Sequence, residues 1–159
     1  MKIKLFQKTV ALLVSSTVAL FSCSDTNGST SEREVSRASG TYILTELNVA
    51  PPQDIDGDGV ISVNLISELN CISGILFLRP DGTYELNLTG VEVTSITNGR
   101  FFFSCGTPRN SDSTWNIQNG SVTLFADVTT TPYKLADNQL TRIVGEDLPG
   151  IQSVVYVKQ

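Results

Sequence analysis

The sequence predicts an all-β domain, an up-and-down β-barrel of eight or nine strands with a short helix after the first strand. Three observations support this fold. Short apolar or alternating runs recur at close intervals from residue 40 onward. Turn-forming dipeptides such as Asn119-Gly120 separate these runs, and no long helical pattern occurs. Consecutive hairpins favour a meander, and closing it into a barrel removes exposed edges.

Turn signals bound the expected strands. Pro51-Pro52 should end the first strand, Gly82 should adopt a positive φ in a turn, and Asn119-Gly120 suits a two-residue hairpin. Apolar residues at helical spacing predict the short helix within residues 63–69. The segments from which the strands are drawn are residues 40–49, 74–79, 83–89, 91–96, 100–105, 113–117, 121–127, 132–135, 139–144 and 152–158.

One face of several strands is apolar. Alternation places Tyr84, Leu86 and Leu88 on the same side of their strand, and Val122 and Leu124 on the same side of theirs. In a barrel these side chains would either line a ligand cavity or fill the core. Both arrangements need the same alternation, so the sequence leaves them open.

The first 22 residues are expected to be a signal peptide. Three lysines precede an uncharged, mostly apolar run that is too short to span a membrane comfortably. The run ends Leu20-Phe21-Ser22-Cys23, which resembles the lipobox of bacterial lipoproteins. The resemblance implies cleavage before Cys23 and attachment of lipid to its thiol. The alternatives are an uncleaved anchor and an ordinary signal with a chance cysteine. Residues 23–39 are polar and predict a flexible tether, and residues 40–159 the barrel domain.

Composition narrows the function. Removal of the signal would leave eight basic and sixteen acidic residues, which argues against a nucleic-acid partner. Histidine is absent, which excludes Ser-His-Asp and Cys-His catalysis and histidine metal sites. A carboxylate pair or calcium-assisted chemistry would still be possible. With no spacing that forces such a pair, we expect a protein that is not an enzyme.

Two cysteines remain besides Cys23. Cys71 and Cys105 can form a disulfide, because an exported chain meets an oxidising compartment. Such a bridge would stabilise the domain by roughly 3 to 4 kcal/mol, because it closes a loop in the unfolded chain. The alternative is a pair of buried free thiols.

An acidic segment follows the first strand. Asp54, Asp56 and Asp58 alternate along it, and a glycine follows at the sixth position, as in the first half of a calcium-binding loop. The three carboxylates and the carbonyl of Val60 would be ligands. The twelfth position, which should be acidic, is a leucine, so Glu68 (or Asn64) would have to substitute. The alternative is a solvated acidic turn without a metal.

Several short motifs suggest a family. They are Gly40-Thr41-Tyr42 at the start of the first strand, Leu78-Arg79-Pro80-Asp81-Gly82-Thr83-Tyr84, and Ser113-Thr114-Trp115 followed by Asn119-Gly120 and Val122-Thr123-Leu124. Together they resemble the lipocalin-like lipoproteins of Bacteroidetes-type bacteria, over about residues 40–158. The resemblance implies a meandering barrel and the binding of a small apolar molecule.

These expectations combine into one hypothesis. The chain would be a lipid-anchored cell-envelope protein, an outer membrane lipoprotein on the periplasmic or the surface side, with a barrel that binds a small apolar ligand. The alternative is a structural or interaction subunit of an envelope complex, with a filled core and a protein partner. The cofactor expectation is limited to Ca²⁺.

Overall fold

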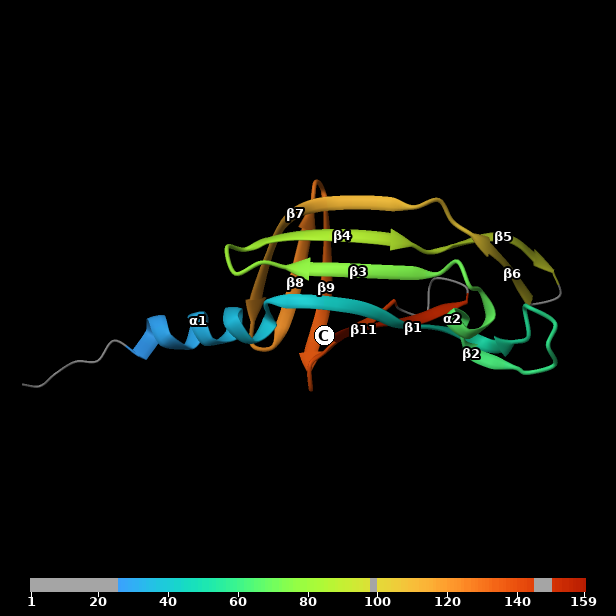
Figure 1. Cartoon of the computed structure of the whole chain (residues 1–159), viewed down its shortest axis with the longest axis horizontal. Coiled ribbons are helices and arrows are strands. Elements are labelled where there is room, and N and C mark those ends of the chain that lie inside the picture. Colours follow the sequence, from blue (N-terminus) through green and yellow to red (C-terminus); the bar gives the residue numbers. More distant parts are fainter. Residues whose placement is uncertain (1–25, 98–99, 145–149) are drawn as a thin grey trace, which may run out of the picture.

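Eight antiparallel strands close into a barrel in the computed structural model, which describes residues 26–97, 100–144 and 150–159 (Figure 1). Each strand pairs with the next in the order β1-β3-β4-β7-β8-β9-β10-β11, and β11 pairs with β1 to close the ring. The predicted all-β barrel is therefore confirmed. The barrel strands are β1 (Gly40–Gln53), β3 (Ser73–Leu78), β4 (Thr83–Thr89), β7 (Arg109–Gln118), β8 (Ser121–Ala126), β9 (Thr129–Ala136), β10 (Gln139–Ile143) and β11 (Ile151–Lys158).

The tight turns behave as the sequence predicts. Asn119 and Gly120 have φ values of 51° and 73°, and the register Gln118↔Ser121 leaves them as a two-residue loop between β7 and β8. Gly82 takes a φ of 84° before β4. Positive φ at both Asn119 and Gly120 matches the right-handed twist of β7 and β8, and for this reason an Asn-Gly loop fixes the register of the hairpin.

A ninth strand and a short helix follow β1. β2 (Ser62–Asn64) pairs with β1 at the edge of the sheet, and α2 (Leu65–Glu68) confirms the predicted helix. The Asn64 side chain caps α2 by accepting a hydrogen bond from the Ile66 amide. The expectation that Pro51-Pro52 ends β1 is wrong, because the strand continues to Gln53, which pairs with Ser62. Proline is tolerated there because this end of β1 has only a short edge strand beside it.

Two expected strands lie outside the barrel ring. β5 (Val91–Thr97) and β6 (Arg100–Cys105) form a separate two-stranded sheet, and β4 pairs directly with β7 across this insertion. The Gly106 amide donates to the Gly90 carbonyl at 2.9 Å and closes the base of the hairpin. The hairpin of β5 and β6 is therefore left out of the barrel meander, because β4 forms its backbone hydrogen bonds with β7 instead.

The segment expected to be a flexible tether forms helix α1 (Thr26–Ala38). Its C-terminal turn rests against one end of the barrel, where Ala38 is fully buried and its carbonyl accepts a hydrogen bond from the Tyr42 hydroxyl. Lys158 Nζ also donates to the Arg37 carbonyl. These contacts satisfy carbonyls that a helix end leaves without partners, a tertiary effect that composition does not show. Among the described residues, no helix is long and apolar enough to cross a membrane.

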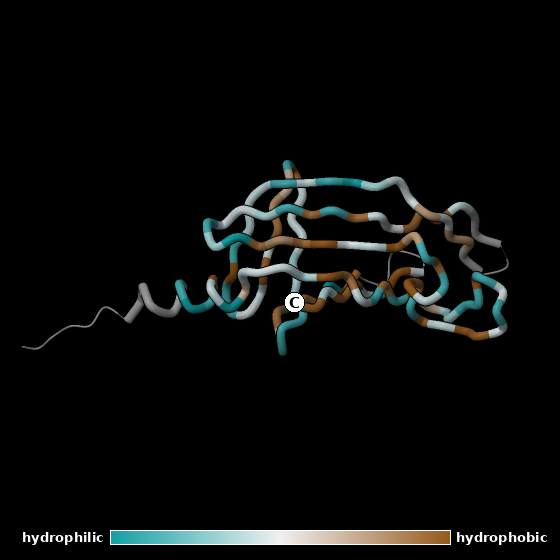
Figure 2. The backbone as a smooth tube through the Cα atoms, in the orientation of Figure 1, coloured by the Kyte–Doolittle hydropathy of each residue, from teal (hydrophilic) through white to brown (hydrophobic). Residues whose placement is uncertain are grey.

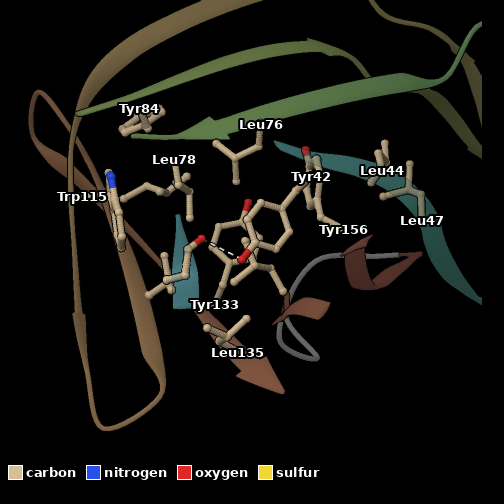
Figure 3. Packing of buried hydrophobic residues seen from close by; sticks show 14 of the residues in the cluster. Tyr42, Leu44, Leu47, Leu76, Leu78, Tyr84, Trp115, Tyr133, Leu135 and Tyr156 are labelled. Carbon is tan, nitrogen blue, oxygen red and sulfur yellow. Dashed lines mark hydrogen bonds between the residues drawn. The ribbon is translucent and has the colours of Figure 1, made fainter. Parts of the chain in front are cut away.

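The barrel is tightly filled near α1. Tyr42, Leu76, Val122 and Leu140 have no exposed surface there, and Trp115 is 5% exposed. Figure 3 shows labelled core side chains from several strands converging in the interior. Along the chain, hydrophobic and hydrophilic stretches alternate on most barrel strands (Figure 2). This end is therefore a conventional packed core.

Candidate functional site

The other end of the barrel contains a cavity of about 310 Å³. Its residues come from seven barrel strands (β1, β4, β7, β8, β9, β10 and β11), from Gly90 after β4 and from Val91 at the start of β5. Strand β4 runs away from α1 (Figure 1), so Gly90 and Val91, which follow its last residue, place this part of the lining at the end away from α1. Most of the lining is apolar: Leu44, Leu47, Leu86, Leu88, Val91, Leu124, Ala126, Ile151 and Val154. An apolar cavity of this size in a barrel can hold one small molecule.

The polar residues of the lining are Tyr84 on β4, Ser111 on β7, Thr131 and Tyr133 on β9, Arg142 on β10 and Tyr156 on β11. Tyr133 on β9, Arg142 on β10 and Tyr156 on β11 belong to consecutive strands of the sheet. The rings of Tyr133 and Tyr156 meet edge to face, with centroids 6.1 Å apart, an arrangement that aromatic quadrupoles favour. Figure 3 shows both rings in the barrel interior.

The phenols of this group stay protonated over the ordinary pH range. Burial raises the pKa of Tyr133, and the Arg142 guanidinium beside it opposes part of that rise. Burial raises the pKa of Tyr156 well above its ordinary value, and the neighbouring Tyr133 adds to the effect. Both hydroxyls can therefore donate hydrogen bonds to a ligand.

The structure divides the apolar residues singled out in the sequence. Tyr84, Leu86, Leu88 and Leu124 line the cavity, whereas Val122 is fully buried in the packed end of the barrel. Sequence reasoning did not identify Arg142. Its signal was available, because Leu140 and Arg142 are two residues apart on one strand and therefore face the same side.

The acidic loop brings three predicted ligands together. One side-chain oxygen from each of Asp54, Asp56 and Asp58 lies within 4.8 Å of the others, and all three residues are exposed. The Gly57 and Gly59 amides donate to the two oxygens of Asp54, at 2.8 and 3.1 Å. Both glycines have positive φ. This acidic triad could hold a metal ion.

The other predicted ligands have local partners. The Val60 amide donates to Asp58 Oδ1 at 2.7 Å, which ties Val60 to the triad through its backbone. Glu68 is outside the group of converging oxygens. It is 6% exposed, and its Oε2 accepts a hydrogen bond from the Ile55 amide at 2.8 Å, which fastens the loop to α2. Asn64 Oδ1 accepts from the Leu47 and Ile66 amides and is used as a cap.

The predicted disulfide is present. Cys71 and Cys105 are bonded, with Cα atoms 6.0 Å apart, within the usual range of about 4.4 to 6.8 Å. The bond links the segment before β3 to the last residue of β6. It therefore fastens the inserted hairpin to the barrel. Cys23 and the expected signal peptide lie outside the described residues.

Comparison of the chain with known protein families, with characterised proteins and with solved structures finds no match.

Proposed function

We propose that this chain is a lipid-anchored cell-envelope protein whose barrel binds a small apolar ligand. The observation that carries the proposal is the cavity of about 310 Å³, lined mainly by aliphatic side chains, at one end of the barrel. Burial of an apolar molecule there would remove both surfaces from water. The absence of histidine from the chain supports binding rather than catalysis.

The anchor part of the proposal comes from the lipobox-like segment ending at Cys23. Helix α1 meets the packed end of the barrel (Figure 1), and the cavity lies toward the other end. An anchor ahead of α1 would thus leave the cavity end free to receive a ligand. The anchor would hold the protein at the outer membrane, on its periplasmic or its surface side.

The anchor is tested with Cys23→Ser. The variant should lose metabolic labelling by a fatty acid and either leave the membrane fraction or accumulate as an uncleaved precursor. Ser22→Ala is a matched control, because it keeps a small residue before the cysteine and should label normally. Labelling that persists in Cys23→Ser would refute lipidation at this residue.

Ligand binding is tested by filling the cavity. Leu88→Trp places a larger ring in the lining and should weaken the binding of a neutral apolar fluorescent dye by about tenfold or more, the loss expected from removing a few buried methylene contacts. Ile143→Trp is the control, because Ile143 is 75% exposed on β10. Dye binding that responds equally to both substitutions, or that is absent from the unsubstituted chain, would contradict an internal site.

We also propose that the acidic triad binds Ca²⁺. Three carboxylates whose oxygens converge within 4.8 Å repel one another, and a hard cation with oxygen ligands would relieve that repulsion. The triad supplies only part of the coordination that Ca²⁺ prefers, so the affinity should be weak, in the roughly millimolar range of extracellular modules.

The calcium proposal is tested by thermal unfolding with increasing CaCl₂ or MgCl₂. Calcium should raise the midpoint of unfolding in a concentration-dependent way and magnesium should do so poorly. Asp56→Asn keeps a side-chain acceptor but removes the charge, and should abolish the response. Asp137→Asn, at an exposed turn with a φ of 48°, should leave it intact. No calcium response at several millimolar would reduce the triad to a solvated turn.

One observation favours the alternative role as an interaction subunit. Val60, Ile61 and Val63 are 62%, 69% and 51% exposed beside the edge strand β2. Exposed apolar groups beside a sheet edge suit a protein partner. If Ile61→Ser and Val63→Ser prevented recovery of a stable envelope partner while dye binding was absent from the unsubstituted chain, the interaction role would replace ligand binding.

A further inference from the structure

One charged side chain lies in the otherwise uncharged cavity. Of the lining residues that the structure describes, Arg142 alone carries a charge. On β10, Leu140 is fully buried and Ile143 is 75% exposed, so alternation directs Arg142 inward with Leu140. Across the ladder, Arg142 is opposite Val154 of β11, another lining residue. The guanidinium thus belongs to the interior of the barrel.

Two of the lining tyrosines, Tyr133 and Tyr156, lie on the strands that flank this arginine. The register of β9 and β10 pairs Leu140 with Leu135, and continued by two residues it sets Arg142 opposite Tyr133. On the other side of β10, Tyr156 of β11 is opposite Leu140. A cation and two phenolic hydroxyls therefore occupy adjacent strands on one wall. Aliphatic side chains make up most of the remaining lining, and Tyr84, Ser111 and Thr131 are its other polar residues.

Arg142 differs from Arg79 and Arg109, which both have a carboxylate partner. Arg79 pairs with Glu85 at 2.8 Å and Arg109 with Glu92 at 4.0 Å. Within residues 26–97, 100–144 and 150–159, no carboxylate comes within 4.0 Å of the Arg142 guanidinium. The half-buried Arg142 side chain hydrogen-bonds with Tyr133. A guanidinium that has no carboxylate partner among the described residues keeps further donors free to face the mostly apolar lining. An anion bound in the cavity would compensate its charge.

We propose that the ligand is an amphipathic monoanion, a carboxylate on an apolar chain, and that Arg142 pairs with its head group. This deepens the proposed ligand-binding function and rests on it. A guanidinium can hold a carboxylate through two parallel hydrogen bonds, and the protonated Tyr133 hydroxyl can donate a third. The chain would extend past Leu86, Leu88 and Leu124. A cavity of about 310 Å³ is at the small end for ligand sites, which favours a single short chain over a two-chain lipid.

The proposal is tested by comparing decanoate with decanol, which share an alkyl chain and differ in charge. Isothermal titration calorimetry is run at pH 7 on the full chain carrying Cys23→Ser, so that no lipid anchor competes. Decanoate should bind about tenfold or more tightly than decanol. Arg142→Met should remove that preference and leave decanol binding within about twofold of the original. Arg142→Lys should keep part of the preference.

A matched control and two contrary outcomes complete the test. Arg109→Met removes a cation whose side chain is 76% exposed on β7, and should change neither affinity. Unchanged decanol binding by Arg142→Met would show that the barrel is intact, so the loss of decanoate binding would report the charge. Equal binding of both compounds before and after Arg142→Met would overturn the anion proposal and leave an apolar site standing. If neither compound nor the neutral dye binds, the proposed ligand-binding function fails with it.

Discussion

Loss of the Cys71–Cys105 bond should destabilise the domain by about 4 kcal/mol. The two cysteines are 34 residues apart in sequence. Loop-closure entropy for a cross-link of that span corresponds to about 4 kcal/mol at 25 °C. The folded structure gives the bond a further role, because β5 and β6 share no backbone ladder with the barrel sheet. The bridge is the covalent link between the end of that hairpin and the segment before β3.

The measurement is urea denaturation at equilibrium, followed by far-UV circular dichroism. Three samples are compared: the oxidised chain, the same chain in reductant, and the Cys71→Ala/Cys105→Ala variant. The last two should agree within about 1 kcal/mol, and both should unfold at a lower urea concentration than the oxidised chain. For a domain of this length the loss corresponds to about 10 to 20 °C in the midpoint of thermal unfolding.

Two results would contradict the expected loss of stability. If reduction shifts the free energy of unfolding by less than about 1 kcal/mol, the denatured chain is not constrained as the loop-entropy estimate assumes. If the reduced chain is stable but the double variant is not, the loss comes from packing of the cysteine side chains, since Cys71 contacts the core cluster. Either result would refute the stated magnitude of the cross-link.

Three further substitutions test the packed barrel. Burial raises the pKa of Tyr42 to about 12. The contribution of this shift to the free energy of unfolding is complete below pH 10 and is lost between pH 10 and 12, as the phenol ionises in the unfolded chain. In urea titrations, raising the pH from 8 to 11 should therefore destabilise Tyr42→Phe by about 1 kcal/mol less than it destabilises the original chain. In Gly74→Ala the new Cβ would lie 3.2 Å from the Tyr156 hydroxyl, which should cost about 1 to 3 kcal/mol by the same assay and weaken dye binding. Trp115 Nε1 donates to the Arg79 carbonyl at 3.0 Å; Trp115→Phe leaves that acceptor unpaired and should lower the free energy of unfolding by about 1 to 3 kcal/mol in chemical denaturation followed by circular dichroism. The packing argument would be contradicted if Tyr42→Phe lost as much stability as the original chain between pH 8 and 11, or if either of the other two variants kept its full stability.

Local sequence signals were sufficient for much of this molecule. Turn chemistry and alternation predicted the barrel strands, because a two-residue loop with positive φ and a half-buried strand each require particular residue types at particular positions. The disulfide was predicted from the cysteine count and from the expected export of the chain. The acidic triad followed from spacing, since three aspartates within five residues must lie near one another in a tight loop.

Tertiary structure decided what depends on contacts between distant segments. Whether Leu86 and Leu88 line a cavity or fill a core depends on how β1, β10 and β11 approach them, because the same alternation serves both. The hairpin of β5 and β6 left the ring because β7 occupies the ladder position beside β4. Helix α1 is held against the barrel by hydrogen bonds that could not be predicted from its polar sequence. Arg142 acquired its importance in the same way: its charge is visible in the sequence, but only the closed barrel places that charge among apolar side chains without a carboxylate beside it in the part of the chain that the structure describes.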